Sequence, residues 1–486
     1  MRPAGPIGSV IVAGGGITAW SAAAALKRRI PSLQVALIVI PLSAGALADR
    51  MISTLPSIHG FHQDIGLTAA DTIGGAASDL RLGTLFEGWA DELAPYVHAY
   101  GAYGTPVGGV SFHQLWLRDH QRASLPPFDY FSPAAELARS GRPPTAGSDS
   151  VEFGLQLTLD RYGELMRAYA LHLGVTEHRM GIQDVELRTD DGFIDKLTLD
   201  DGTSQRADLY VDCTGPEAIL HSRFQTPLFD WSKWLPCDRL IMTGSEANPA
   251  FGSMDRVTAF ENGWRWAASS PQQSSSGTVY SSYSSAHASD SETLGEAGEP
   301  IAFRQGRLED FWVRNCVALG DAAVMIEPLE WTNLHLVHSQ IDRMVSMMPA
   351  RDCAPIELAE FNRQCAAEAD RVRDFVCLHY VCARRPERFW KDAAAVAPPD
   401  SLAHSLSLFA ERGRLPYHEE ETFSRDSWLA VLLGQGFEPR RIDPMADLVP
   451  PAEAQLAFAT MRRSLESFTL PLAADILPEL NPRGVR

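Results

Sequence analysis

The 486-residue sequence has no stretch of about 18 or more consecutive apolar residues, the length that a membrane-spanning helix needs. It also has no long run of Lys or Arg, and its formal net charge is −19. A nucleic-acid or anionic membrane surface attracts proteins through clustered positive charge, so we expect neither as a partner. Hydrophobic residues make up 45% of the chain and charged residues 21%, which indicates a folded globular protein.

Cysteine is scarce, and its spacing excludes two common uses. The seven cysteines are an odd number without a Cys-x-x-Cys pair, and no His/Cys cluster has the spacing of a metal site. We therefore expect buried, reduced thiols in a cytoplasmic protein without a bound metal. The apolar run near the start, SVIVA, ends in three glycines and not at a cleavage site, so we interpret it as a strand rather than a signal peptide.

The order of elements predicts an α/β fold with a doubly wound parallel sheet. A strand at SVIVA (9–13) is followed by a helix at ITAWSAAAALKRR (17–29) and a strand at LQVALIVI (33–40). Residues 183–213 alternate apolar and polar side chains and are interrupted twice by Asp-Asp-Gly, which predicts an inserted β-meander that returns to the sheet. After about residue 340 the apolar spacing becomes helical. We therefore divide the chain into a core, residues 1–345, and a largely helical region, residues 346–486.

The turn after the first strand has the spacing of a dinucleotide-binding motif. It reads Gly14-x-Gly16-x-x-Ala19, followed by Trp20, and it lies between a strand and a helix. This arrangement lets the backbone approach a pyrophosphate, which then lies at the helix N-terminus. A plain structural turn is the alternative. The second strand ends in Ile40 and Pro41 instead of the acidic residue that binds a ribose, so a dinucleotide would be held more weakly or differently.

Two further strand–turn segments strengthen the dinucleotide interpretation. ADLYVDCTG (207–215) leads into a glycine turn, and NCVALGDAA (315–323) ends in Gly320-Asp321. A strand ending in Gly-Asp is typical of FAD monooxygenases, where the Asp bonds the ribityl or pyrophosphate region. Asp321 could instead serve only as a helix N-cap. The three signals in this order predict descent from FAD-binding proteins.

Several longer segments carry a resemblance to a known family. They are AGGGITAWSAAAAL (13–26), RLGTLFEGW (81–89), FHQLWLR (112–118), ENGWRWAASS (261–270), NCVALGDAAVMIEPLEWTNLHL (315–336) and FNRQCAAEADRVRDFVCLHY (361–380). In these segments the chain resembles the flavin-dependent halogenases of the tryptophan halogenase family, and the likeness runs nearly end to end. The resemblance implies an FAD-binding, monooxygenase-like core in residues 1–345 and a helical region in 346–486 that covers the substrate side.

The resemblance also implies a reaction. A separate flavin reductase supplies reduced FAD, which reacts with oxygen to give a flavin hydroperoxide. A halide ion attacks this species and forms hypohalous acid, which reaches an indole or another aromatic substrate, either a small molecule or part of a peptide. In the family, a lysine presents the halogen and a glutamate assists at the ring. The oligomeric state is left open, with a homodimer as one option.

The family's glutamate corresponds to Glu330, in EPLEWTNLHL (327–336). A carboxylate can accept the proton lost from the ring or stabilise the cationic intermediate. The alternative is a solvated or helix-capping glutamate. The backbone amides of Thr332 and Asn333 correspond to the halide site, at a helix start that favours anions. Trp331 replaces a small serine and would line the halide site or the substrate pocket, with core packing as the alternative.

The family's lysine corresponds to Arg81, and this departure affects the expected chemistry. A buried lysine can lose its proton and form a haloamine, whereas arginine stays protonated and can only donate hydrogen bonds. Arg81 is therefore an active-site candidate, with a surface salt bridge or a shifted register as alternatives.

Two further candidates come from the resemblance. The motif Trp264-Arg265-Trp266 keeps the two tryptophans that the family places beside the flavin, but the following Ile-Pro is replaced by Ala-Ala. His113 matches a family position near the flavin region, and we place it with Trp331 among the candidate substrate contacts. A hydrogen-bonded core histidine is the alternative.

Two rival functions follow from these departures. Arg81 and the lost Ile-Pro would also suit a flavin monooxygenase that does not halogenate. The missing ribose carboxylate and Trp331 would also suit a catalytically silent binding protein that kept the fold.

Overall fold

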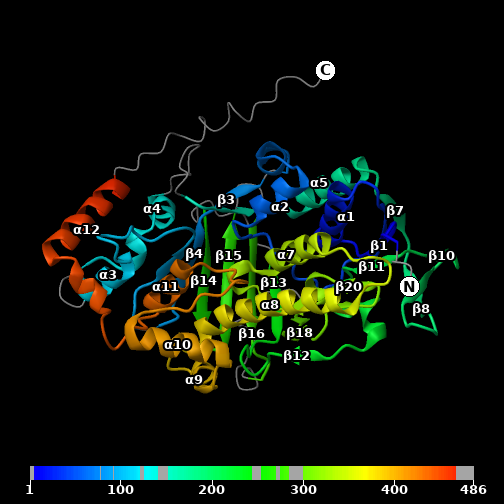
Figure 1. Cartoon of the computed structure of the whole chain (residues 1–486). Helices are drawn as coiled ribbons and strands as arrows, with labels where there is room; N and C mark the ends of the chain where they lie inside the picture. Colours follow the sequence, from blue (N-terminus) through cyan, green and yellow to red (C-terminus); the bar gives the residue numbers. More distant parts are fainter. Residues whose placement is uncertain are drawn as a thin grey trace. The chain divides into compact units, whose positions relative to one another are not determined.

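The computed structural model describes residues 5–76, 78–90, 92–120, 125–140, 151–243, 253–269, 274–283 and 299–466. The chain forms two compact units, each assembled from three segments (Figure 1). Unit 1 comprises residues 1–78, 157–232 and 301–370. Unit 2 comprises residues 79–156, 233–300 and 371–486.

Unit 1 contains the predicted parallel sheet. Its central strand β1 pairs in parallel with β2 on one side and with β11 on the other. The strand order is β19-β20-β11-β1-β2-β7, and only β19 runs antiparallel to its neighbour. The strands are β1 (Ser9–Ala13), β2 (Gln34–Val39), β7 (Thr176–Arg179), β11 (Leu209–Asp212), β19 (Trp312–Val313) and β20 (Cys316–Ala318). Most residues of β1, β2 and β11 are apolar, because both faces of the sheet are covered.

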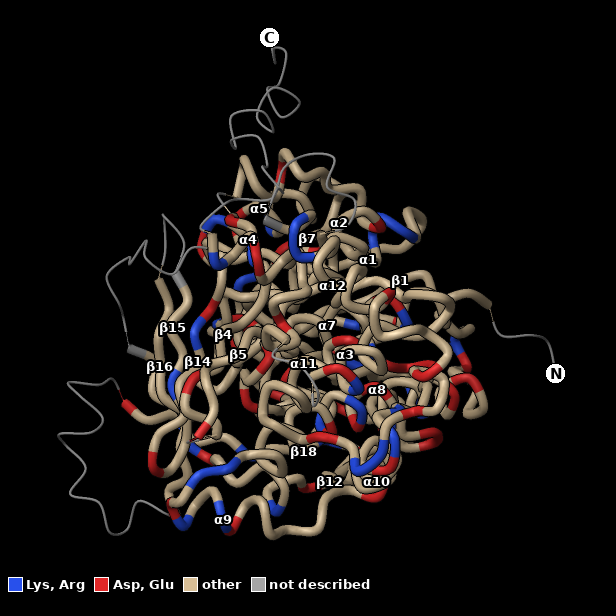
Figure 2. The backbone as a smooth tube through the Cα atoms, turned by 90° about the vertical axis from the view of Figure 1, so that its left-hand side faces the viewer, with Lys and Arg blue, Asp and Glu red and all other residues tan. Residues whose placement is uncertain are grey.

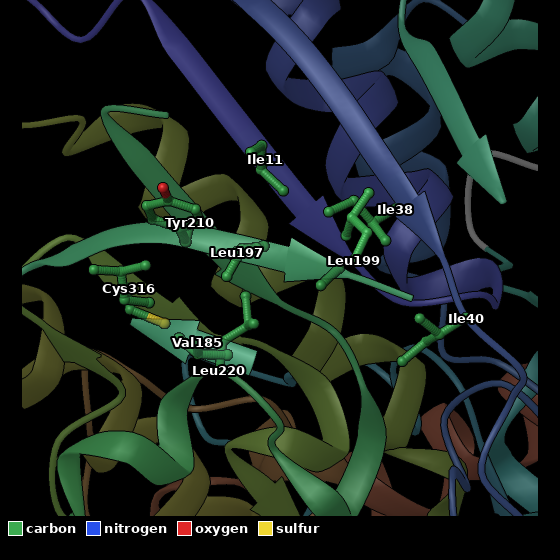
Figure 3. Close-up of a cluster of buried hydrophobic side chains, with 11 residues drawn as sticks. Ile11, Ile38, Ile40, Val185, Leu197, Leu199, Tyr210, Leu220 and Cys316 are labelled. Carbon is green, nitrogen blue, oxygen red and sulfur yellow. The ribbon is translucent and has the colours of Figure 1, made fainter. Parts of the chain in front are cut away.

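One face of this sheet is covered by the predicted β-meander. The meander is an antiparallel sheet of β8 (Ile182–Leu187), β9 (Ile194–Leu199) and β10 (Ser204–Gln205). Its Val185 and Leu197 belong to the same buried cluster as Ile11 and Ile38 of the parallel sheet (Figure 3). Because side chains alternate along a strand, Val10 and Val12 of β1 face the opposite side.

Helices of unit 1 pack around α1. These helices are α1 (Ile17–Arg29), α2 (Ile58–Ile65), α5 (Leu159–His172) and α7 (Asn333–Ser346), and α1 contacts each of the other three. The run of four alanines in α1 is fully buried, which lets the neighbouring helices approach closely. Smaller elements of unit 1 are the π-helical η1 (Ala70–Gly75), η3 (Gly215–Glu217), η4 (His221–Phe224), β12 (Leu228–Asp230), β17 (Ile301–Ala302), β18 (Gly306–Leu308), η7 (Gly320–Ala322), β21 (Val324–Met325) and η8 (Leu329–Trp331).

Unit 2 contains a second, mostly antiparallel sheet. Six of its strands are neighbours in the order β13-β16-β15-β14-β4-β5, and only the β14–β4 pair is parallel. They are β4 (Gly83–Glu87), β5 (Tyr96–Ala99), β13 (Arg239–Thr243), β14 (Met254–Phe260), β15 (Gly263–Ser269) and β16 (Ser274–Tyr280). A separate pair is formed by β3 (Asp79–Arg81) and β6 (Gly154–Gln156).

The later part of the chain is helical, as predicted. It forms α8 (Pro355–Cys382), α9 (Arg388–Ala395), α10 (Asp400–Arg412), α11 (Arg425–Gly434), η9 (Pro444–Leu448) and α12 (Pro451–Glu466). Earlier helices of unit 2 are α3 (Phe112–His120), η2 (Phe128–Phe131) and α4 (Pro133–Ser140). The described residues 347–466 contain no strand, and residues 467–486 lie outside the described part. The predicted fold class, a parallel α/β sheet with an inserted meander and a helical second region, is confirmed.

Charged residues are distributed along the described chain, and the cysteines are buried, as predicted. Lys and Arg are interspersed with Asp and Glu along the backbone (Figure 2). All seven cysteines are free and buried. Within the described ranges, each helix is too short or too polar to cross a membrane. No group of three or more His, Cys, Asp or Glu side chains in those ranges could hold a metal ion.

Candidate functional site

Glu330 lies in a strained turn directly before α7. Its φ is +66° and that of Trp331 is +60°, so two successive residues with side chains adopt the left-handed conformation. Such conformations cost about 1–3 kcal/mol each and persist where the surrounding structure enforces them, often at functional sites. Glu330 is 1% exposed, so a solvated glutamate is wrong. The N-cap residue of α7 is Thr332, so the capping alternative is also wrong.

A buried pair of side chains supports this turn. Glu327, three residues earlier, accepts a hydrogen bond from Gln305 Nε2 at 2.8 Å. Its backbone N–H donates to Gln305 Oε1 at 3.0 Å. Gln305 therefore binds both the backbone and the side chain of the segment that leads to Glu330.

The predicted halide site lies in the first turn of α7. The N–H groups of a first helical turn have no acceptor within the helix, and the helix dipole favours an anion there. Asn333 Nδ2 donates to the carbonyl of Ile326 at 2.9 Å. Among the described residues, Thr332 Oγ1 and Asn333 Oδ1 have no hydrogen-bond partner, although both are buried. The hydroxyl of Thr332 could donate to a halide, whereas the carbonyl oxygen of Asn333 could not.

Trp331 is almost fully buried, at 1% exposure. Its burial agrees with a pocket wall as well as with core packing, so its role stays a prediction.

The glycine turn between β1 and α1 is tight in the way that a dinucleotide motif requires. A Cβ on Gly14, whose φ is +153°, would lie 2.5 Å from the carbonyl oxygen of Cys213. A Cβ on Gly15 would lie 2.0 Å from that of Ile40. Ala19 and Trp20 follow on α1 and are buried. The turn therefore packs directly against the residues that follow β2 and β11.

The N-terminus of α1 already binds an anionic oxygen. Asp49, which the sequence analysis did not identify, accepts a hydrogen bond from the Thr18 backbone N–H at 2.7 Å. A Cβ on Gly16 would lie 2.3 Å from Asp49 Oδ1, so the carboxylate lies directly against the glycine. Burial raises the pKa of Asp49 to about 6, against hydrogen bonds from Thr18 and the charge of Arg50.

Gly320 and Asp321 form the third predicted turn, after β20. Gly320 has φ +61°, and its N–H donates to Gln340 Oε1 at 2.8 Å. Asp321 Oδ2 accepts from the Ala48 backbone N–H at 2.8 Å and caps no helix, so the N-cap alternative is wrong. Burial, together with the charge of Asp49, raises the pKa of Asp321 to about 8.

The position and composition of these three turns are those expected of an FAD-binding site. They follow β1, β11 and β20, which are neighbouring parallel strands, at the edge where such sheets bind nucleotides. The glycine turn has no room for side chains, and the N-terminus of α1 attracts a negative oxygen, here that of Asp49.

Arg81 belongs to a buried polar network in unit 2. Its Nε forms an ion pair with Asp255 Oδ2, and its NH2 group donates to Thr84 Oγ1 at 2.6 Å. Asp255 Oδ1 accepts from Gln156 Nε2 at 2.8 Å. The guanidinium carbon lies 5.2 Å from the ring centre of Tyr100. Arg81 is 0% exposed, so the surface-salt-bridge alternative is wrong, and its catalytic role stays a prediction.

Trp264 and Trp266 point to the same face of β15, since they are two residues apart on a strand. Both are buried, and their ring centres are 6.1 Å apart. Trp264 Nε1 donates to the Tyr380 hydroxyl at 3.2 Å, and Trp266 Nε1 to Ser275 Oγ at 3.3 Å. A Cβ on Gly277 of β16 would lie 1.9 Å from the Trp266 ring, so this glycine makes room for the indole.

His113 of α3 lies in the core of unit 2. It shares a 3.0 Å hydrogen bond between Nε2 and the carbonyl of Gly413, at the end of α10. Burial lowers the pKa of His113 to about 4, so the ring is neutral and donates this bond at pH 7. The geometry favours the alternative interpretation of a hydrogen-bonded core histidine.

Sequence analysis also missed a pocket of about 260 Å³ in unit 2. Residues of α10, of α11 and of the connection between them line it: Ser405, Leu415, Pro416, Tyr417, His418, Glu419, Glu421, Phe423, Ser424, Arg425 and Trp428. Burial raises the pKa of Glu421 to about 7, against a hydrogen bond from the Trp428 side chain. Glu421 Oε1 and His418 Nε2 have no hydrogen-bond partner in the described chain. The only sequence signal was the density of aromatic, His and Glu residues in PYHEEETF (416–423).

Comparison with known proteins gives one consistent result. The model of the tryptophan halogenase family matches residues 9–451. Two solved structures of flavin-dependent halogenases resemble the whole chain. BrvH from Brevundimonas sp. BAL3 is 33% identical, with 98% of this chain and 99% of that chain covered and a TM-score of 0.89. Xcc4156 from Xanthomonas campestris is 32% identical, with 99% and 100% covered and a TM-score of 0.90.

A curated relative agrees. The tryptophan 6-halogenase SttH from Streptomyces toxytricini is 27% identical over 93% of this chain and 94% of the relative. The predicted family and the predicted enzyme class, a flavin-dependent halogenase that uses FAD and a halide, are confirmed. Neither the non-halogenating monooxygenase nor the silent binding protein is favoured. The chain therefore belongs to the tryptophan halogenase family.

Proposed function

We propose that the protein uses reduced FAD, oxygen and a halide to halogenate an indole or a related aromatic compound, with Glu330 as the assisting carboxylate. The observation that carries this proposal is the strained and buried position of Glu330 directly before α7, within a chain that matches the family over residues 9–451.

The glycine turn and the neighbouring turns would hold the flavin. Gly14 and Gly16 would let the pyrophosphate approach the N-terminus of α1, and Gly320 and Asp321 would lie toward the ribityl side. When bound, reduced FAD supplies, with oxygen, the oxidising equivalents that convert halide to hypohalous acid. The family likeness gives Trp264 and Trp266 the role of keeping the flavin from direct oxygenation of the substrate.

The start of α7 holds the halide and the assisting base. The backbone amides of Thr332 and Asn333 donate to the halide, and the Thr332 hydroxyl adds a third donor. Glu330 stabilises the positive charge that develops on the aromatic ring and then accepts the ring proton. A buried carboxylate interacts more strongly with such a charge than a solvated one does.

Arg81 acts as a fixed hydrogen-bond donor to hypohalous acid and not as a nucleophile. Its guanidinium remains protonated, and Asp255 and Thr84 hold it in one orientation. This role predicts slower halogenation than a lysine would give at the same position.

The pocket between α10 and α11 is a candidate binding site for an aromatic compound within unit 2, and its lining includes neither Glu330 nor Arg81. Phe423 and Trp428 offer aromatic faces to an indole, and Glu421 offers a carboxylate to a cationic amine. The helical region 346–486 then covers the substrate side. Trp331 remains a second candidate contact, and His113 supports the fold of this region instead.

The partners are a flavin reductase, which delivers reduced FAD by diffusion, and an aromatic small molecule or peptide. We propose a cytoplasmic location, supported by seven buried free thiols. A homodimer remains one option for the oligomeric state.

A reconstituted reaction tests the proposal. The purified protein is incubated with FAD, NADH, a flavin reductase, oxygen and indole, with chloride or bromide, and the products are analysed by mass spectrometry. We expect products with halogen isotope patterns. A product that gains one oxygen atom and no halogen, with either halide, would contradict the proposal.

A further inference from the structure

One short segment contacts all three turns assigned to FAD. This cover segment, residues 43–49, follows β2, and its Ala46, Leu47 and Ala48 are at most 1% exposed. Ser43 Oγ donates to Glu217 Oε1 at 2.8 Å, in the turn after β11. At its other end, Ala48 and Asp49 bind the remaining two turns.

The contacts at that end involve the groups that would meet the dinucleotide. The Ala48 N–H donates to Asp321, and the Asp49 carboxylate accepts from the Thr18 N–H on α1. A Cβ on Gly16 would lie only 2.3 Å from Asp49 Oδ1, so this oxygen lies directly against the glycine. The motif keeps this position free of side chains so that a phosphate oxygen can approach the backbone. In this chain a carboxylate oxygen lies there.

We infer that Asp49 sets the affinity for FAD by competing with its pyrophosphate for the N-terminus of α1, and that the affinity falls as Asp49 ionises. The inference rests on the proposed use of FAD. Two anions cannot share this position, so the pyrophosphate must displace the ionised carboxylate or meet its repulsion. A protonated Asp49 carries no charge, and its hydrogen bond to the helix is weaker.

The charged and titratable groups around Asp49 strengthen this competition. Asp321 on η7 adds a second carboxyl group, and each raises the cost of further negative charge. The Cys213 thiol after β11 has a pKa raised well above its ordinary value by burial and stays neutral. Arg50 is the neighbouring cation, and its guanidinium donates to the carbonyl of Ser43 at 3.0 Å.

The sign of the pH dependence follows from the raised pKa of Asp49. Below about pH 6 the carboxyl group is protonated, so the repulsion of a pyrophosphate is absent and FAD binds best. As the pH rises past about 6, Asp49 ionises and the affinity falls. Asp321, with a pKa of about 8, extends the decline at higher pH.

The test is a fluorescence titration of the full chain with oxidised FAD between about pH 5.5 and 8. We expect wild-type affinity for FAD to fall about tenfold over this range. By linkage, this corresponds to FAD binding raising the pKa of Asp49 by about one unit. Asp49→Asn is expected to bind FAD about tenfold more tightly than wild type near pH 7.5 and to lose most of the decline between pH 5.5 and 7. Asparagine keeps an oxygen that can accept from Thr18, so the start of α1 is preserved.

Asp342→Asn is the matched control. Asp342 pairs with Arg29 at 2.9 Å, at the opposite end of α1, and burial raises its pKa to about 6 as well. We expect this variant to bind FAD as wild type does. If Asp49→Asn impairs folding, judged by the thermal midpoint of the apoprotein, Asp49→Ser replaces it, since serine is small and carries no charge at any pH of the titration.

The inference is overturned if the folded Asp49 variant binds FAD no more tightly than wild type, or keeps the same pH profile. Complete absence of FAD binding at every pH would also overturn it. The titration uses no reductase, halide or aromatic compound. Normal FAD binding without halogenation would therefore contradict only the proposed function.

Discussion

The Glu330 turn in unit 1 and the Arg81 network in unit 2 are both buried, but they differ in how well their polar groups and backbone are satisfied. Arg81, Asp255 and Gln156 form a connected set of charged and neutral hydrogen bonds on unstrained strands. The Glu330 turn has two left-handed residues in succession, followed by Thr332 with a hydroxyl that has no partner among the described residues.

The two sites therefore suit different tasks: the Arg81 network fixes a charge in one place, whereas the Glu330 turn leaves polar groups available to a ligand. A fully connected buried network fixes its members rigidly, and removal of one member leaves a charge without compensation. A strained turn with unmatched polar atoms costs free energy, which a protein retains when a ligand uses those groups. This contrast supports the proposal that Glu330 assists at the aromatic ring and that Arg81 supplies a fixed charge.

The largest effect on stability is expected from Arg81→Met. The variant leaves the buried Asp255 carboxylate without its cation, so the free energy of unfolding should fall by about 3–5 kcal/mol. Denaturant titration measures the loss. Arg81→Met combined with Asp255→Asn should recover a large part of it. If Arg81→Met is as stable as wild type, the buried network contributes no more to the free energy of unfolding than an exposed ion pair does.

A smaller effect is expected at Glu421, a carboxylate whose Oε1 also lacks a partner in the described chain. Its pKa is about 7, so it becomes charged as the pH rises from 6 to 8. The affinity for tryptamine, a cationic indole, should rise about tenfold over that range, since ion pairing requires the ionised form. Calorimetry should show no such rise for Glu421→Gln, nor for neutral indole with wild type. A rise in Glu421→Gln would exclude this carboxylate as the cause.

A gain in stability is expected from Glu330→Gly. Glycine adopts positive φ without the clash that other residues suffer. The free energy of unfolding should increase by about 1 kcal/mol, while halogenation is lost. Thermal denaturation and product analysis on the same preparation measure both. A clear loss of stability would mean that the contacts of the Glu330 side chain outweigh the strain of its backbone conformation.

The smallest effect is expected from the exposed ion pair between Arg388 and Asp392 on α9. Its side chains are 92% and 69% exposed, whereas those of Arg81 and Asp255 are at most 1% exposed. Replacing both exposed residues by alanine should change the free energy of unfolding by about 0.5 kcal/mol or less, because water screens the charges. If this loss in free energy of unfolding is comparable to that of Arg81→Met, burial does not determine how much an ion pair contributes to stability.

The sequence predicted the elements whose information is local. The apolar strands around Gly14 and the Asp-Asp-Gly turns of the meander depend on neighbouring residues, and the structure contains each of them. The residues of the Glu330 turn could be named through the family likeness. Its backbone conformation could not be predicted, because EPLEW contains no glycine to indicate positive φ.

Contacts across long stretches of chain could not be predicted. Asp49 binds an amide 31 residues away, and Asp255 lies 174 residues from Arg81. Neither carboxylate belongs to a motif, so only the folded structure shows which groups they bind. The pocket around Glu421 was missed for a similar reason, since its walls come from a connection without periodicity.

The most direct test compares the halogenated product formed by wild type, Glu330→Gln and Glu327→Gln under identical reductase, FAD and halide conditions. Glutamine keeps the size of the side chain and removes its charge. We predict that Glu330→Gln forms at least about 100-fold less product while its thermal midpoint and FAD affinity stay close to those of wild type. Glu327→Gln should remain active, because Glu327 binds Gln305 and supports the turn. If Glu330→Gln halogenates as fast as wild type, the carboxylate has no part in the reaction and the central claim is wrong.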